Sequence, residues 1–352
     1  MSENKHKLKV GAYILWGALT VFILVLILSF NDIDEIFTVI GTVNVKYILY
    51  AVACILAYVA LYPLSLCILT KARGCDIKMS VTYNIAMTEH FFNGVTPFAT
   101  GGQPFQAYAY SKAKVSPSES TSLLLMNFLV FMLVTNSFAA LALIYFKRFV
   151  TDTAMTIIAI FGFTMNFTVL AVTFALGNSK TVRALLIRFI DFLCKFKWIA
   201  KFLAPKAPEL KQYFVNVQEA FTALKKKWGA FLLAFISKVL SMGFYYATTY
   251  FILHAFGVGV PFSEMFFVIC GTSFAITMVV FLPTPGSSGG IEFAFQSIFA
   301  SIASSAAAIS YGGMLIWRLL SYYMVMLISL IFYIVLEIYF SKKRKSEITV
   351  DE

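Results

Sequence analysis

Long apolar runs constrain this chain more than any other feature of its sequence. Such runs cover residues 10–30, 47–69, 123–146, 154–176, 229–253 and 314–340. Each can cross about 30 Å of hydrocarbon as a helix that rises about 1.5 Å per residue. Only 13% of the residues are charged and 60% are hydrophobic, whereas about 25% are charged in soluble domains. The sequence therefore predicts an all-α polytopic membrane protein with six clear transmembrane helices.

The first of these runs begins like a secretory signal peptide. Lys5, Lys7 and Lys9 precede it, as basic residues precede the apolar segment of a signal. However, the run is about twenty residues long, enough to span a membrane. Asn-Asp-Ile-Asp at 31–34 follows it in place of a small-residue cleavage pattern. We therefore predict a first transmembrane helix that is retained.

Proline and glycine break two further hydrophobic regions, 79–115 and 262–308. Residues 283–290 read Pro-Thr-Pro-Gly-Ser-Ser-Gly-Gly, which cannot continue a helix. Residues 96–105 align with 284–293 without a gap, and Thr, Pro, the Gly-Gly pair and Phe coincide. Chance similarity between two Gly/Pro-rich turns is the alternative. Paired broken segments in two halves indicate a transporter-type binding site, so we predict two broken hairpins, re-entrant or built of short helices.

The distribution of basic residues predicts the orientation of these segments. Lys and Arg gather before the first run, at 71–78, at 112–114, throughout 178–228 and in the tail after 341. Only Lys46, Lys147 and Arg148 fall in the opposite set of loops. The positive-inside rule then places both termini in the cytosol, with hairpin 79–115 entering from the cytosol and hairpin 262–308 from outside. This is the relation of inverted repeats, and full crossing by each arm, giving ten spans, is the alternative.

The same pattern divides the chain into four parts. We predict a first membrane repeat at 1–176, a basic cytosolic loop at 177–228, a second membrane repeat at 229–340 and a cytosolic tail at 341–352. Within the loop, apolar residues recur at helical spacing: Leu210, Tyr213, Phe214, Val217, Phe221 and Leu224. We expect amphipathic helices on the inner leaflet, and a solvated linker is the alternative. Ser116 to Glu119 form a capping box that begins the next span.

The net charge of +11 points to lipid rather than nucleic acid, because the basic residues lie between hydrophobic spans. The expected partners are membrane phospholipids and the anionic inner leaflet. The sequence has no Walker A motif, no CxxC pair, and no second histidine after Glu89-His90 to complete a zinc motif. We therefore predict no catalytic residue, metal or cofactor, and expect His90 to be a polar core or cavity residue.

Four ionisable residues are expected at membrane depth, away from the ends of the apolar regions: Glu89, Lys238, Glu292 and Arg318. A charge at the bilayer centre costs about 2.5–3.5 kcal/mol on the mildest scale, so these groups are expected to pair inside a wet cavity. Arg318 could instead snorkel outward, and Glu292 could act only on a helix dipole. The helices after the two Gly-Gly pairs would offer N–H groups to a phosphate. The predicted substrate-binding residues are Glu292, Arg318, Lys238, Glu89, Gly101, Gly102, Gln103, Pro285, Gly289 and Gly290.

Three segments carry a family resemblance: Thr-Pro-Phe-Ala-Thr-Gly-Gly-Gln-Pro at 96–104, Pro-Thr-Pro-Gly-Ser-Ser-Gly-Gly-Ile-Glu at 283–292 and Trp-Arg-Leu-Leu-Ser-Tyr at 317–322. They resemble the lysylphosphatidylglycerol synthase transmembrane-domain family, the flippase-like half of multiple peptide resistance factor proteins. The resemblance implies a bacterial inner-membrane protein that handles phospholipid. In fused members the membrane half moves aminoacylated phosphatidylglycerol to the outer leaflet, and a soluble half makes it from aminoacyl-tRNA.

The printed sequence contains no such soluble half, so we expect lipid translocation, with a separate lipid-modifying enzyme as a potential partner. One alternative is phosphatidylglycerol lysyltransferase activity, which contributes to resistance to cationic antimicrobial peptides. Another is a carrier for polyprenyl-phosphate-linked sugars. The headgroup, the energy source and the oligomeric state are left open by the sequence.

Overall fold

A computed structural model describes residues 43–96, 99–150, 153–196, 204–280, 287, 289–302 and 307–348. These ranges are helical, and none of them contains a strand. The helices are α3 (Val45–Leu61), α4 (Leu64–Arg73), α5 (Met79–Val95), α6 (Gly102–Lys112), α7 (Pro117–Ala142), α8 (Phe146–Phe149), α9 (Thr153–Asn178), α10 (Lys180–Leu193), α12 (Ala207–Lys225), α13 (Trp228–Ala255), α14 (Met265–Val279), α15 (Gly290–Ile302), α16 (Ala307–Arg318) and α17 (Val325–Ile348). A π-helix, η6 (Leu319–Met324), joins the last two.

Within these ranges, six helices are long and apolar enough to cross a membrane: Val45–Arg73, Pro117–Tyr145, Met155–Asn178, Trp228–Ala255, Phe262–Val279 and Gly312–Lys343. Five of them coincide with predicted spans, which confirms the all-α polytopic class. The sixth, Phe262–Val279, is the first arm of the second predicted hairpin. The predicted helix at 10–30 lies outside the described residues.

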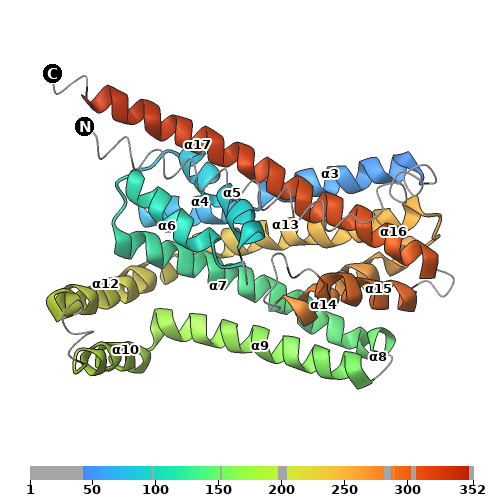
Figure 1. The fold of residues 1–352 in the computed structure, drawn as a ribbon, viewed down its shortest axis with the longest axis horizontal. Coiled ribbons are helices and arrows are strands. Elements are labelled where there is room, and N and C mark those ends of the chain that lie inside the picture. The colour runs from blue at the N-terminus through green and yellow to red at the C-terminus, as the bar shows by residue number, and fades with distance from the viewer. Residues whose placement is uncertain are drawn as a thin grey trace.

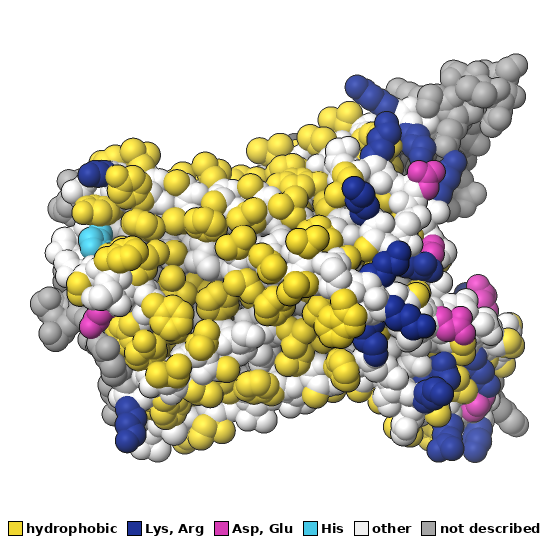
Figure 2. Space-filling view, turned by 180° about the vertical axis from the view of Figure 1, so that it is seen from behind, with side chains coloured by type: hydrophobic (Ala, Val, Ile, Leu, Met, Phe, Trp, Pro, Cys, Tyr) yellow, Lys and Arg dark blue, Asp and Glu magenta, His cyan; other side chains and the backbone are white. Residues whose placement is uncertain are grey.

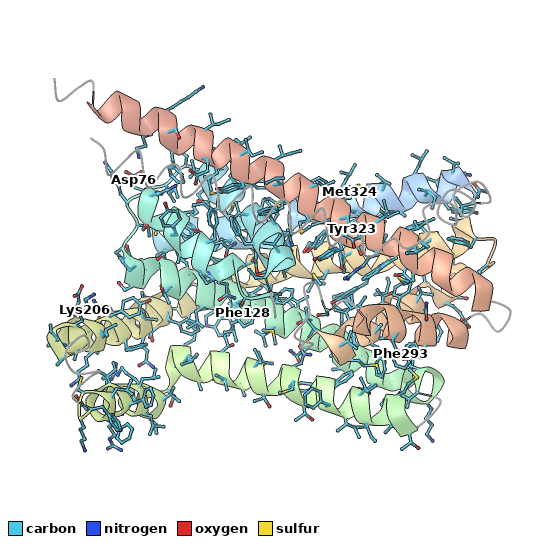
Figure 3. The ribbon with its side chains drawn as sticks, in the orientation of Figure 1. Asp76, Phe128, Lys206, Phe293, Tyr323 and Met324 are labelled. Carbon is cyan, nitrogen blue, oxygen red and sulfur yellow. The ribbon has the colours of Figure 1, made fainter. Side chains whose placement is uncertain are left out.

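The two broken hairpins occupy opposite halves of the bundle. Long helices α7, α9, α13 and α17 run along its length, while α5 and α6 lie in the left half and α14 and α15 in the right half (Figure 1). Figure 3 shows Asp76, just before α5, toward the left end and Phe293, on α15, in the right half. In the space-filling view hydrophobic side chains cover the middle of the molecule, and Lys and Arg gather at one end, the left end of Figure 1 (Figure 2). We call this the basic end.

Side-chain packing fixes this arrangement. α13 packs along α3, and α17 packs along α5. α9 approaches α14 closely because Gly162 has no side chain: a Cβ there would lie 2.5 Å from the Met278 carbonyl oxygen. Beside this contact, the Asn166 amide donates to the Thr277 carbonyl over 3.2 Å. α7 begins as predicted, with the Ser116 hydroxyl accepting from the Glu119 N–H at 3.3 Å.

The basic loop folds into α10 and α12. The helical spacing predicted for 210–224 is confirmed by α12, but its apolar face does not lie free for lipid. Val217, Phe221 and Leu224 are buried, and α12 packs on α7 and α9. The Gln218 amide donates to the carbonyls of Leu176 (3.1 Å) and Ser179 (3.0 Å), which ties α12 to the end of α9.

Candidate functional site

Glu89 is buried on α5, where the first broken hairpin reaches the bundle interior. Its Oε2 accepts hydrogen bonds from the Tyr62 hydroxyl at 3.2 Å and from the Gln106 amide at 3.4 Å. The Gln106 Nε2 also lies 3.3 Å from the carbonyl oxygens of Ile85 and Ala86. Donors from α3 and α6 therefore meet this carboxylate, and hydrogen bonds of this kind are what a buried carboxylate requires.

A proline kink supplies the other side of this arrangement. Pro63 has no N–H, so the helix breaks between α3 and α4 and its last carbonyls need other donors. The Tyr83 hydroxyl lies 3.2 Å from the Val59 oxygen and 3.3 Å from the Ala60 oxygen. The next two carbonyls accept from α13: Leu61 from the Ser237 hydroxyl at 3.0 Å and Tyr62 from Lys238 Nζ at 3.1 Å.

Lys238 is thus a buried cation that stabilises the kink. It is 0% exposed, and its Nζ lies 3.2 Å from the centroid of the Tyr62 ring. A cation against an aromatic face is stabilised further when it is desolvated. Tyr62 therefore contacts Lys238 through its ring and carbonyl and Glu89 through its hydroxyl.

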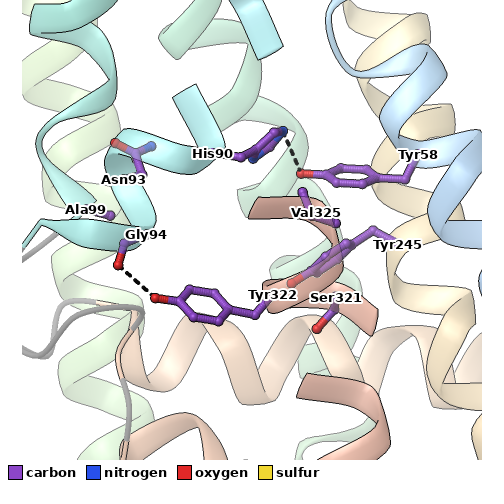
Figure 4. A pocket seen from close by; sticks show the side chains of 9 residues that line it. All are labelled: Tyr58, His90, Asn93, Gly94, Ala99, Tyr245, Ser321, Tyr322 and Val325. Atoms are coloured by element: carbon purple, nitrogen blue, oxygen red, sulfur yellow. Dashed lines mark hydrogen bonds between the residues drawn. The ribbon is translucent and has the colours of Figure 1, made fainter. Parts of the chain in front are cut away.

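A cavity of about 150 Å³ lies beside this group, between α3, α5, α13 and the π-helix. Figure 4 shows the residues that line it, which are Tyr58, His90, Asn93, Gly94, Ala99, Tyr245, Ser321, Tyr322 and Val325. The Tyr58 hydroxyl lies 3.5 Å from His90 Nε2, and the Tyr322 hydroxyl donates to the Gly94 carbonyl over 2.7 Å. The lining is therefore aromatic and polar together, and the prediction for His90 is confirmed.

Glu89, Lys238 and Arg318 are not among the residues that line this cavity. Glu89 precedes His90 in the chain, and Arg318 holds its guanidinium carbon 4.3 Å from the centroid of the Tyr322 ring. Arg318 is only 4% exposed, so it does not snorkel outward. The prediction that Glu89, Lys238 and Arg318 line one cavity directly is therefore not met for this cavity.

The π-helix η6 begins directly after Arg318 and carries Ser321 and Tyr322 to the cavity. The Ser321 side chain is buried beside Tyr245, which also lines the cavity. One-turn π-helical segments occur often at functional sites, because the extra residue per turn redirects the side chains that follow.

The first Gly-Gly turn is closed by side chains of α5. The Gly101 N–H donates to the Thr96 hydroxyl at 2.9 Å, and the Gly102 N–H donates to Asn93 Oδ1 at 2.8 Å. The expectation that these two N–H groups are free for a phosphate was therefore wrong. Glycine is required here for close approach, since a Cβ at Gly102 would lie 2.6 Å from Asn93 Oδ1. Gln103 follows on the first turn of α6 and does not line the cavity.

Only part of the second turn is described. Gly289 adopts a φ of +89°, which suits glycine, and α15 begins at Gly290. The Ser287 hydroxyl donates to the Val280 carbonyl over 3.2 Å. Pro285 and the Glu292 side chain lie outside the described residues. Pairing of Glu292 with Arg318 or Lys238 stays a prediction.

Sequence reasoning missed Ser329 on α17, which acts on the turn that carries Glu89. Its Oγ accepts from the Phe91 N–H at 2.9 Å and donates to the Met87 carbonyl at 2.5 Å. In a regular helix those two backbone groups bond each other. The Ser329 hydroxyl therefore competes with their mutual bond in the turn that contains Glu89 and His90. A lone serine in an apolar run gives no sequence signal of this role.

Comparison with known proteins places this chain in a family. The family model described as "Lysylphosphatidylglycerol synthase TM region" matches residues 13–329. No curated protein matches the chain. Because the match covers nearly all the described helices, including both broken hairpins and the π-helix, the chain belongs to the lysylphosphatidylglycerol synthase transmembrane-region family.

Proposed function

We propose that this multi-pass membrane protein translocates a phospholipid between the leaflets of a bacterial cell membrane, with its basic end and both termini in the cytosol. One observation supports this most: a polar, aromatic cavity in the bundle interior, walled by the broken hairpin helix α5 and by the π-helix. Irregular backbone at membrane depth is tolerated where it lines such a cavity. Lipid is the cargo that the family suggests.

The cavity suits one polar group of a headgroup. Its volume is about 150 Å³, and hydroxyl, amide and imidazole side chains line it together with tyrosine rings. Hydroxyl and amide groups of Ser321, Tyr245 and Asn93 would meet phosphate oxygens, and the tyrosine faces would meet an ammonium group. The acyl chains would stay in the hydrophobic belt outside. An aminoacylated phosphatidylglycerol carries both a phosphate and an ammonium.

A direct test fills the cavity. Ser321→Leu adds apolar volume to the lining, so it should lower the movement of a fluorescent phospholipid reporter in proteoliposomes by about tenfold, an increase of about 1.4 kcal/mol in the barrier. Ser137→Leu is the matched control, because Ser137 is exposed on α7. Thermal unfolding in detergent shows whether both variants fold. Wild-type translocation by a folded Ser321→Leu protein would reject this cavity as the headgroup site.

The enzyme alternative needs its own assay. If the chain acts on lipid made by a separate enzyme, it should not make lysyl-phosphatidylglycerol itself. Expression of these 352 residues in a host that lacks this lipid should then yield no new ninhydrin-positive phospholipid. Appearance of such a lipid would favour lysyltransferase activity instead. Movement of a polyprenyl-phosphate reporter in preference to phospholipid would favour the sugar-carrier alternative.

A further inference from the structure

Helix α10 carries an apolar strip that the described part of the protein leaves uncovered. Leu185, Phe189, Phe192 and Phe196 are 56%, 56%, 51% and 45% exposed. They are spaced four, three and four residues apart, so they lie on one side of the helix and of the turn that follows it. Three phenylalanines and a leucine on one exposed face are unusual for a surface that meets only water.

Contacts on the other side of α10 fix the direction in which this strip faces. Ile190 is buried, and Arg183 and Leu186 border a small, mostly apolar cavity shared with α7, α9 and α12. Asp191 pairs with Lys211 of α12 at 2.5 Å, and Ser179 caps the start of the helix by accepting from the Val182 N–H at 3.2 Å. The strip is thus presented by a helix held to the bundle and is not a loop that could fold back.

The charges around the strip are basic. Lys180, Arg188 and Lys195 are exposed on α10 and the turn after it. The helix's one carboxylate, Asp191, already pairs with Lys211. This part of the molecule belongs to the basic end, where Lys and Arg gather (Figure 2). A basic border on an apolar strip complements a surface that is anionic outside and apolar beneath.

The orientation of α10 matches such a surface. Figure 1 shows α10 end-on at the end of α9, which lies in the plane of the picture. α10 therefore runs across the direction of the spanning helices, at the level where a span ends. A helix in that position lies in the plane of a membrane surface.

We propose that α10 is an interfacial helix that inserts Leu185, Phe189, Phe192 and Phe196 into the anionic leaflet at the basic end. Arg188 and Lys195 contact lipid phosphates there. This inference does not depend on lipid translocation. Within the basic loop, α10 and not α12 is then the helix that meets lipid, since the apolar face of α12 is buried in protein.

The test compares two positions on α10 in the full-length protein, with the native cysteines replaced. Phe189→Cys lies in the strip, and Ala184→Cys is the matched control, exposed on the polar side. Each thiol carries a fluorophore in nanodiscs of phosphatidylcholine alone or with phosphatidylglycerol. Brominated lipid should quench the label at 189 several-fold more than the label at 184, and more strongly in the anionic nanodiscs. An aqueous quencher should show the reverse order.

Three outcomes would overturn the proposal. Equal access of the aqueous quencher to both labels means that the strip is solvated. Protection of position 189 from both quenchers means that a second copy of the chain covers it. Equal quenching of the label at 189 by brominated lipid in both kinds of nanodisc means that α10 does not prefer anionic lipid. As a second arm, Arg188→Glu with Lys195→Glu should abolish the dependence on phosphatidylglycerol, whereas Lys206→Glu, an exposed charge reversal before α12, should preserve it.

Discussion

At the scale of single residues, Tyr62 joins two buried charges that the sequence places far apart. Its ring and carbonyl hold Lys238, and its hydroxyl meets Glu89. The sequence identified both charges from their depth in apolar runs. It could not identify Tyr62 or Gln106, because their role depends on the proline kink and on the return path of α6. The buried charges are therefore predictable from their position in apolar runs, whereas their hydrogen-bond partners are predictable only from the tertiary structure.

Gly102 offers the sharpest test at this scale. Gly102→Ala places a Cβ 2.6 Å from Asn93 Oδ1 and 2.8 Å from Glu89 Cγ, so it should displace the side chains that hold Glu89. Overpacking of this kind costs about 1–3 kcal/mol. Gly243→Ala is the control, because a Cβ there meets nothing within 4 Å inside helix α13. It should stabilise the helix by about 0.5–1 kcal/mol. Thermal unfolding in detergent measures both, and equal effects would contradict the proposed close approach.

At the scale of elements, long apolar helices were predictable and their irregularities were only partly so. Five spans follow directly from runs of about twenty apolar residues, and Pro63 marks the kink between α3 and α4. The π-helix η6 has no Gly or Pro to signal it. The apolar face of α12 was assigned to lipid because periodicity gives a buried side without saying what covers it. Protein covers that face here.

Ser329 tests how α17 shapes α5. Ser329→Ala removes the hydroxyl between the Phe91 N–H and the Met87 carbonyl, which can then bond each other as in a regular helix. Stability should change by less than about 1 kcal/mol, because one hydrogen-bond arrangement replaces another. Lipid translocation should fall, because the turn that carries Glu89 and His90 loses its hydrogen bonds to α17. Ser329→Thr retains the hydroxyl and should retain more activity. Equal loss in both variants would indicate a packing role only.

At the scale of the whole molecule, the two broken hairpins lie in opposite halves of the bundle (Figure 1). The sequence predicted this relation from the Gly-Gly alignment and from the distribution of basic residues. The hairpin α5–α6 lies in the half of the bundle that carries the basic end, and its entry from the cytosol stays a prediction of the positive-inside rule. The side of the membrane that this end faces, and the repeat boundaries at 176 and 229, are proposals that labelling can address.

Single cysteines in a cysteine-free protein can establish this orientation. Ser263→Cys lies before α14 and Asp76→Cys before α5, and both positions are exposed. An impermeant maleimide should label Ser263→Cys in intact cells and Asp76→Cys only after permeabilisation. Native Cys75 is a poorer probe, because burial raises the pKa of its thiol and the thiolate is the reactive form. Labelling of both positions from the same side would contradict inverted repeats. Opposite sides with Asp76→Cys outside would keep the repeats and reverse the proposed orientation, placing α10 on the outer leaflet.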